Sequence, residues 1–362
     1  RRKLGKTDRD FLRGGTMRAS EKEERIVPKR MLHLLGMTLA MAVVIIGCSL
    51  LIDVESAKEV DQLQPFPPSA TSKEHRQNDA VPQSPLTTDV LPDPKPVKEQ
   101  TWYRDQVVVL MYHHIADNPQ TRYAIRPEQF AAHMAFLHAN DLRPISLQEF
   151  LRFVDTGVLL TKNAVLLTFD DGYESYYKEA FPVLKKYGFP SVNFVIAGNL
   201  RDAADRRREN MITPLSHAQI AEMLASGLVQ LGSHTYSLHS MEIANEWGER
   251  GPTTSPVYLE ELNRLEREQE YRDRLFVDFK ISRAALEELI QDQVTSISLP
   301  YGYMNEIVLE TARQAGYRHI FTSLPGPVKA DVDPLQIPRY DVGLADVDEK
   351  DLMQLFQAVR MK

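Results

Sequence analysis

Residues 166–172 read Leu166-Leu167-Thr168-Phe169-Asp170-Asp171-Gly172, an apolar run that ends in two adjacent carboxylates and a glycine. The run predicts a buried strand, and the glycine permits a turn directly after it. Because side chains alternate along a strand, the two acids can project the same way only where the strand is ending. One acid can then bind a cation while the other accepts a proton from water. The alternative is a simple turn that caps a helix beginning near Glu174.

The composition indicates one large globular domain with appendages. The chain has 362 residues, of which 43% are hydrophobic, and this is enough for a sizeable core. The formal net charge is -7 and the isoelectric point is about 5.9. Outside the first thirty residues no basic surface dominates, so a nucleic-acid partner is not expected.

The N-terminal part predicts a membrane anchor. Residues 1–30 form a basic segment with eleven Lys or Arg against five acids, and Met31 to Ile52 is an apolar stretch long enough to span a bilayer. The charge rule places the basic segment in the cytoplasm, so we expect a bacterial membrane protein whose main domain is extracellular. The segment Ile45-Ile46-Gly47-Cys48, which contains the one cysteine of the chain, resembles a lipoprotein processing site. A single-pass span and a lipid anchor both stay open, and we favour the span because the run reaches bilayer length only when it includes residues 50–52.

Residues 53–104 predict a Pro-rich linker, and residues 105–362 the main domain. Eight prolines and many polar residues occur between positions 53 and 100, with almost no apolar periodicity. The main domain has no cysteine, so disulfides and thiol nucleophiles are excluded there. Its stability must come from its core and from a bound metal.

From residue 105 onward, short apolar strands alternate with amphipathic helices, which is typical of an α/β domain. About seven strands, each followed by a helix, suggest a barrel. A charged run at 258–274 predicts an exposed helix; a solvated face is favoured there over a partner surface. Strands are predicted at 107–111, 164–169, 191–196, 229–232, 296–299, 319–322 and 337–340, and helices at 128–140, 147–154, 176–187, 217–225, 282–291, 306–315 and 350–359.

Unusual polar segments follow the predicted strands at their C-terminal ends, where α/β barrels have their active sites. These segments are Met111-Tyr112-His113-His114, Asp170-Asp171, Gly232 to His239 and Leu299-Pro300-Tyr301-Gly302.

A metal site is the favoured interpretation of three of these residues. His234 and His239 are five residues apart, so a turn rather than a helix face must bring their imidazoles together. One carboxylate and two imidazoles hold a divalent transition metal and leave positions open for water and substrate. We therefore predict Asp171, His234 and His239 as ligands, with Zn²⁺ as the default metal. Ni²⁺, Co²⁺, Fe²⁺ or Mn²⁺ can occupy the same ligands, and a lone histidine is more often a surface or capping residue than a ligand.

The Thr168-Phe169-Asp170-Asp171-Gly172 motif, the histidine pair and Leu299-Pro300-Tyr301-Gly302 resemble the motifs of NodB-type polysaccharide deacetylases, carbohydrate esterase family 4. The resemblance covers roughly residues 105–345. It implies a distorted (β/α) barrel and hydrolysis of N-acetyl groups from N-acetylglucosamine units of a polymer. It also implies that Asp170 is the general base, that Asp171, His234 and His239 bind the metal, and that the backbone N–H of Tyr301 is an oxyanion donor.

Two departures from the common family pattern point to one branch. Most members have an arginine two residues before the Pro-Tyr pair, where this chain has Ser298, and they take their acid from a C-terminal Leu-x-His. Here no histidine follows His319. The arrangement resembles the circularly permuted branch, the poly-β-1,6-N-acetylglucosamine deacetylases of the PgaB and IcaB type. That match implies that His113 is the acid, and His114 would then point away as a packing residue.

Other polar and aromatic residues have open roles. Arg339 is the candidate to replace the missing arginine by pairing with Asp170, and a structural salt bridge at the barrel rim is nearly as plausible. The candidates for the glycan groove can equally be core or rim residues. They are Tyr173, Trp247, Tyr303 and Met304.

The expected function is metal-dependent N-deacetylation of an N-acetylglucosamine polysaccharide, with poly-β-1,6-N-acetyl-D-glucosamine of biofilm matrix as the favoured substrate. Peptidoglycan or chitin-type deacetylation, O-deacetylation of another glycan and a non-catalytic glycan-binding module are the alternatives. We expect a monomeric catalytic domain that is tethered to the membrane through residues 31–52.

Overall fold

The computed structural model of the protein describes residues 100–200 and 211–360. The predicted basic segment, the apolar stretch and most of the linker lie outside these ranges. Within them, no helix combines the length and the hydropathy that crossing a bilayer requires.

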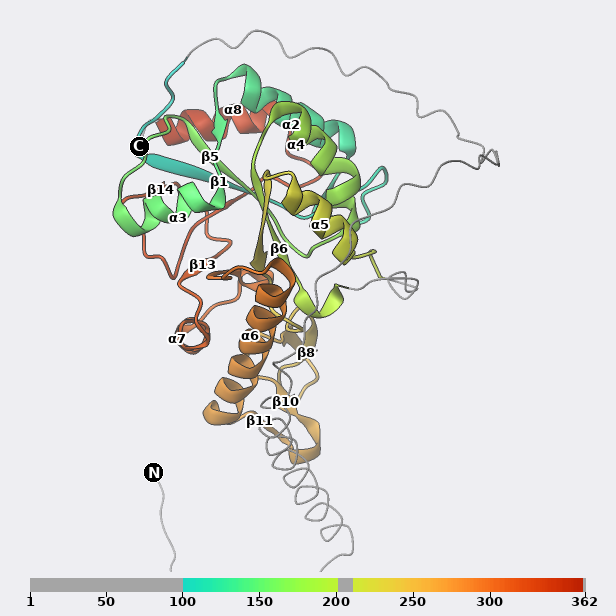
Figure 1. The fold of residues 1–362 in the computed structure, drawn as a ribbon. Helices are drawn as coiled ribbons and strands as arrows, with labels where there is room; N and C mark the ends of the chain where they lie inside the picture. Colours follow the sequence, from blue (N-terminus) through green and yellow to red (C-terminus); the bar gives the residue numbers. More distant parts are fainter. Residues whose placement is uncertain (1–99, 201–210, 361–362) are drawn as a thin grey trace, which may run out of the picture. The chain divides into compact units, whose positions relative to one another are not determined.

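The centre of the fold is a nine-stranded, mainly parallel sheet with the order β13-β12-β7-β6-β5-β1-β14 (Figure 1). The predicted α/β class is therefore confirmed. The strand β14 pairs with β1 in the antiparallel sense, and β4 and β15 pair with β5 and β1 beside the main path. The strands are β1 (Gln106–Tyr112), β4 (Arg143–Pro144), β5 (Ala164–Phe169), β6 (Ser191–Val195), β7 (Val229–Ser233), β12 (Ser296–Ser298), β13 (His319–Phe321), β14 (Val328–Lys329) and β15 (Tyr340–Asp341).

The segment 337–341 bridges strand β13, at one edge of this sheet, and strand β1, near the opposite edge. Ile337 forms a parallel bridge with Phe321 of β13, and β15 pairs in parallel with Leu110 and Met111 of β1. We predicted one continuous strand at 337–340, but Pro338 has no N–H to give to a ladder, so the pairing is interrupted there. The bridging segment curls the sheet towards the barrel that the sequence suggested.

Helices cover both faces of the sheet. In Figure 1, α2, α4 and α8 lie together, and α6 extends away from the sheet in the direction of β8 (Met241–Ile243), β10 (Tyr258–Leu259) and β11 (Arg264–Leu265). The prediction at 176–187 corresponds to a π-helical turn at Tyr176–Ala180 that continues into α4. The helices are α2 (Pro127–Ala139), α3 (Leu147–Thr156), α4 (Phe181–Tyr187), α5 (His217–Ala225), α6 (Glu268–Ile290), α7 (Glu306–Ala315) and α8 (Glu349–Arg360).

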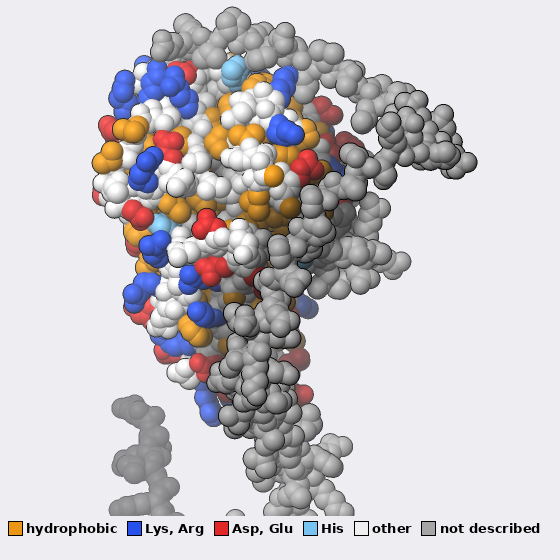
Figure 2. All heavy atoms as spheres, viewed as in Figure 1, with side chains coloured by type: hydrophobic (Ala, Val, Ile, Leu, Met, Phe, Trp, Pro, Cys, Tyr) orange, Lys and Arg blue, Asp and Glu red, His pale blue; other side chains and the backbone are white. Residues whose placement is uncertain are grey.

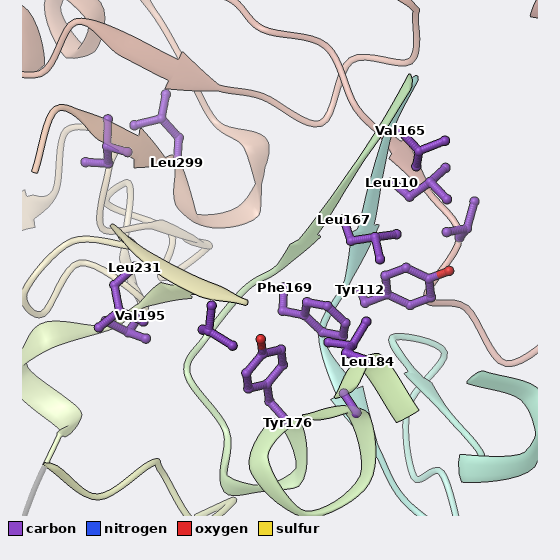
Figure 3. Packing of buried hydrophobic residues seen from close by; sticks show 14 of the residues in the cluster. Leu110, Tyr112, Val165, Leu167, Phe169, Tyr176, Leu184, Val195, Leu231 and Leu299 are labelled. Atoms are coloured by element: carbon purple, nitrogen blue, oxygen red, sulfur yellow. The ribbon is translucent and has the colours of Figure 1, made fainter. Parts of the chain in front are cut away.

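The central strands are buried on both sides, so they are apolar throughout rather than alternating. In β1, Leu110 and Tyr112 belong to a large cluster beneath the helices, whereas Val109 belongs to a smaller cluster on the opposite face with α3. Figure 3 shows part of the large cluster, where Leu167 and Phe169 of β5 lie beside Tyr112. Each fully buried Leu or Phe contributes roughly 1.5–3 kcal/mol relative to an exposed one.

The prediction of a helix at 258–274 is correct for residues 268–274, which begin α6, and wrong for the residues before them. Tyr258–Leu259 (β10) pairs with Arg264–Leu265 (β11) in a short antiparallel hairpin. Asn263 interrupts any helix there because its φ is 51°. The helix α6 begins only at Glu268, and the helix predicted at 282–291 is the C-terminal part of its 23 residues.

Other short pairs were also missed. The strand β2 (His114–Ile115) pairs with β3 (Ala124–Ile125), and β8 (Met241–Ile243) pairs with β9 (Arg250–Pro252). Two- and three-residue strands have too little periodicity for a sequence pattern to show.

The folded domain begins before residue 105. Trp102 and Tyr103 are buried against Phe356 of α8. The Trp102 N–H donates to Asn163 Oδ1 at 2.7 Å, which fixes this segment beside the start of β5. The last residues of the predicted linker therefore belong to the core.

The face of the molecule seen in Figure 2 has acidic and basic side chains interspersed among apolar and neutral ones. On this face the charges form no single large patch of one sign.

Candidate metal centre

Two consecutive left-handed residues turn the chain at the end of β5. Asp171 has a φ of 75° and Gly172 a φ of 71°, a conformation that is uncommon for a residue with a Cβ. A Cβ at Gly172 would also lie 3.0 Å from the Cβ of Val195. The turn separates the two carboxylates, so that Asp170 and Asp171 have different partners.

Asp171, His234 and His239 offer three potential ligand atoms within 4.8 Å of one another. The Nε2 atoms of His234 and His239 lie 3.3 and 3.1 Å from Asp171 Oδ1. His234 follows β7, and a turn with Thr235 at a φ of 70° brings His239 back beside it. Burial alone would raise the pKa of Asp171, but the two imidazoles outweigh it and hold the pKa well below its usual value. An ionised carboxylate is the form that binds a metal.

The hydrogen bonding of this cluster fits a cation. His234 Nδ1 lies 2.9 Å from the carbonyl oxygen of Ser298, so in the neutral ring this nitrogen carries the proton and donates it. The Nε2 lone pair then faces Asp171 Oδ1, a buried oxygen that accepts no aligned hydrogen bond from the described part of the chain. Two lone pairs 3.3 Å apart repel each other unless a positive charge lies between them. The residues present therefore fit a divalent metal.

Asp170 is held by a buried arginine. Arg339 donates from its two terminal nitrogens to both carboxylate oxygens of Asp170, at 2.8 Å each, and Ser298 Oγ donates to Oδ2 at 3.0 Å. The side chains of Arg339 and Asp170 are only 1% and 3% exposed. Burial raises the pKa of Asp170, but the charge of Arg339 outweighs this and lowers it to about 2. The pair lies inside the domain rather than at an exposed rim.

His113 lies in the same cleft, beside an acid that the sequence analysis missed. Its Nδ1 is buried without a hydrogen-bond partner among the described residues, and so is Oδ1 of Asp341. Burial raises the pKa of Asp341, and the nearby imidazole of His113 opposes the rise. The signal in the sequence was weak, because Asp341 is a single acid two residues after Arg339.

His114 does not point away as we expected. It borders the cleft, where its Nδ1 lies 2.8 Å from Ser175 Oγ and its ring packs edge-on against Tyr173. The reason is that the strand pairing changes at this position: β1 ends at Tyr112, and His114 belongs to the separate β2–β3 pair. Simple alternation from β1 therefore does not apply to it. Burial lowers the pKa of this imidazole.

These side chains surround one cleft of about 450 Å³. The ring of Tyr301, a residue with a φ of 57°, lies over His239 with 4.6 Å between centroids. Of the predicted site residues, only Arg339 is not in its wall, because it lies behind Asp170. The wall includes His113, His114, Tyr123, Asp170, Asp171, Tyr173, His234, His239, Tyr301 and Asp341.

The four candidates for a glycan groove, three aromatic residues and one methionine, lie in three different environments. Tyr173 lines the cleft. Tyr303 and Met304 pack against the large core cluster. Trp247 is 78% exposed in the turn between β8 and β9 and lies outside the cleft wall. Of the four, Tyr173 alone therefore borders this cleft.

We expect Gly343→Ala to displace His113. A Cβ at Gly343 would lie 2.7 Å from the Cα of Tyr112 and 3.4 Å from the nitrogen of His113, and both are backbone atoms that cannot rotate away. The variant should lose about 1–3 kcal/mol of unfolding free energy, while the affinity of the Asp171, His234 and His239 cluster for Zn²⁺ should stay unchanged. Urea unfolding and metal titration measure this. Gly326→Ala is the control, because its Cβ would meet only Pro338 at 3.4 Å. Wild-type stability in Gly343→Ala would contradict the prediction.

The chain is similar to known proteins in sequence and in fold. The chain is 29% identical over 244 residues to the poly-beta-1,6-N-acetyl-D-glucosamine N-deacetylase of Escherichia coli K12. The matched region covers 64% of this chain and 36% of that protein. The chain thus spans about a third of that relative's length. A de-N-acetylase from Aggregatibacter actinomycetemcomitans has a similar structure, with a TM-score of 0.62 and 26% identity over 69% of this chain and 100% of that one.

A second solved structure and a family model identify the family. The BpsB deacetylase domain from Bordetella bronchiseptica has a TM-score of 0.57 and 31% identity, over 68% of this chain and 97% of that domain. Residues 159–320, which include Asp170, Asp171, His234 and His239, match the family model described as polysaccharide deacetylase. The chain belongs to the polysaccharide deacetylase family.

Proposed function

We propose that this protein is a metal-dependent N-deacetylase that removes acetyl groups from N-acetylglucosamine units of an extracellular polysaccharide. The observation that carries the proposal is a buried, ionised carboxylate, Asp170, beside a three-ligand cation site, with His113 in the same cleft. Amide hydrolysis needs an activated water, stabilisation of an oxyanion and an acid for the leaving amine.

The cation site supports metal-assisted hydrolysis. A divalent cation held by Asp171, His234 and His239 supplies Lewis acidity at the amide carbonyl and lowers the pKa of water. We propose Zn²⁺ as the resident metal, because one carboxylate and two imidazoles are a ligand set that it commonly takes. Reconstitution with Ni²⁺, Co²⁺, Fe²⁺ or Mn²⁺ is the comparison that tests this choice.

Asp170 is the proposed general base. A carboxylate has about four lone-pair sites; Arg339 takes one on each oxygen, and Ser298 takes the second on Oδ2. One site on Oδ1 is left, and we propose that it accepts the proton of the attacking water. The charge of Arg339 outweighs the effect of burial and keeps this carboxylate ionised at neutral pH.

His113 is the proposed acid. Among the described residues, Nδ1 of His113 and Oδ1 of Asp341 have no hydrogen-bond partner, and both side chains line the cleft. An imidazolium at this position can give its proton to the departing amine. The backbone N–H of Tyr301 is the proposed oxyanion donor, since this residue borders the cleft in an unusual left-handed conformation.

The substrate that we propose is poly-β-1,6-N-acetyl-D-glucosamine of biofilm matrix. The support is the similarity to the E. coli poly-beta-1,6-N-acetyl-D-glucosamine N-deacetylase and the position of the proposed acid histidine before the Asp170-Asp171 pair rather than near the C-terminus. We also propose that residues 31–52 tether a monomeric domain to the outer face of a bacterial membrane, as a single span or as a lipid anchor at Cys48. Protease accessibility in intact cells tests the tether.

An acetate-release assay on the full chain tests the function. The metal-loaded protein should release acetate from β-1,6-linked N-acetylglucosamine oligomers, lose this activity with a chelator and regain it with Zn²⁺. Chitin oligomers and peptidoglycan are the comparators. Release from a comparator alone would change the proposed polymer. Metal-loaded protein that binds the oligomers and releases no acetate would instead be a glycan-binding module.

A further inference from the structure

The loop between the two histidine ligands is held by α6. This loop, Thr235 to Leu238, must turn sharply, because His234 and His239 have to meet at one point. Within it, the Leu238 N–H donates to Thr235 Oγ1 at 3.1 Å, and Thr235 has a φ of 70°. A non-glycine residue in this region of backbone conformation is strained, and surrounding contacts must offset the strain.

Asp278 of α6 supplies those contacts on one side. Its Oδ1 accepts the Tyr236 N–H at 2.8 Å, and its Oδ2 accepts both the N–H and the hydroxyl of Ser237 at 2.8 Å each. One turn further along α6, Ser282 Oγ lies 2.7 Å from Ser233 Oγ at the end of β7. The i, i+4 pair therefore fixes both the strand end and the turn that follows it.

The turn is also held from the opposite side. The Ala197 N–H donates to the carbonyl of Thr235, and the Gly198 N–H donates to the carbonyl of Tyr236, both at 3.0 Å. A Cβ at Gly198 would lie 2.4 Å from that Tyr236 oxygen, so the approach is possible only for glycine. The ligand loop is thus clamped between the segment after β6 and helix α6.

Burial of the Asp278 carboxylate carries a desolvation cost. Asp278 is only 6% exposed, and desolvation of a charge is offset only by several good hydrogen bonds. Among the described residues, the three donors that Asp278 has are all in Tyr236 and Ser237, the middle of the ligand loop. All of these hydrogen bonds therefore hold the segment that separates the two histidines.

We propose that Asp278 is a positioning residue that sets the distance between the His234 and His239 imidazoles and, through it, the affinity of the site for its metal. This proposal rests on the metal-dependent function proposed above. Contacts that orient metal ligands typically change metal affinity by about 10–100-fold when they are removed. Asp278 acts through the loop backbone and touches no ligand itself.

The test is a metal titration of the full-length protein. Metal-free wild type, Asp278→Asn and Asp273→Asn are titrated with Zn²⁺ against a chromophoric chelator, at a temperature well below the melting temperature of each. Asp273 is the matched control, because it is an exposed acid on the same helix that bonds only Gln269 within the described residues. We expect Asp278→Asn to bind Zn²⁺ about 10–100-fold more weakly and Asp273→Asn to match wild type.

Two further measurements separate positioning from a purely structural role. The absorption spectrum of the Co²⁺-loaded protein should change in Asp278→Asn and not in Asp273→Asn, since it reports ligand geometry. Ser237→Ala removes one donor from an exposed position, so it should fold and weaken Zn²⁺ binding less than Asp278→Asn. A lower melting temperature in Asp278→Asn with unchanged Zn²⁺ affinity and Co²⁺ spectrum overturns the positioning role. If wild type itself binds no divalent cation, the proposed function fails instead.

Discussion

Replacement of Asp170 by Asn is expected to lower acetate release by about 10²–10⁴-fold, the usual contribution of a general base. The amide keeps the shape of the carboxylate but cannot take the proton from water. Metal affinity should stay near that of wild type, because Asp171 and not Asp170 has the imidazole partners. The measurement is the rate of acetate release from β-1,6-linked oligomers by the metal-loaded variant.

The variant also leaves Arg339 without its charge partner, so its stability needs a control. The double variant Asp170→Asn/Arg339→Met removes both charges and should regain stability without regaining activity. Wild-type acetate release by a folded Asp170→Asn protein would remove Asp170 from the mechanism.

Arg339→Met is expected to have the largest effect on stability, a loss of about 3–5 kcal/mol of unfolding free energy. The substitution leaves a buried carboxylate with no cation, whereas the wild-type pair makes two hydrogen bonds of 2.8 Å. Arg339→Lys should be intermediate, since an ammonium cannot bind both oxygens as a guanidinium does. Urea unfolding at neutral pH measures all three proteins. A loss below about 1 kcal/mol, the range of an exposed pair, would contradict the buried-pair interpretation.

The same pair predicts a pH dependence of stability. The pKa of Asp170 is about 2 in the folded protein and about 3.9 in an unfolded chain. Because the folded value is the lower one, the contribution of this pair is fully present above the unfolded value and is lost as the pH falls through about 4 towards 2. In Arg339→Met this part of the acid dependence should disappear.

The sequence predicted the parts of the site that depend on local order. The strand at 164–169 was placed with the bounds that the structure has, because a continuous apolar run that ends in Asp-Asp-Gly has few other solutions. Asp171, His234 and His239 do come together, since polar residues at the ends of parallel strands share one edge.

Contacts between distant segments were less accessible from the sequence. Asp341 and Asp278 are single acids in ordinary surroundings, and only the packing of β15 and α6 brings them to the site. The hairpin at 258–265 was mistaken for helix, because its many Glu, Arg and Leu residues favour a helix locally and only Asn263 breaks it. Trp102 shows the same limit, since its burial depends on α8, more than 240 residues later.

The bridging segment 337–341 has a consequence for when the enzyme becomes competent. Arg339 reaches Asp170 across 169 positions of the chain, and contacts of such long separation form late because loop closure is slow. Until that segment docks, the carboxylate lacks its guanidinium and the cleft lacks Asp341. A nascent or freshly unfolded chain should therefore assemble the proposed metal ligands before Arg339 and Asp341 reach the site, and the proposed hydrolysis should be the last property to emerge.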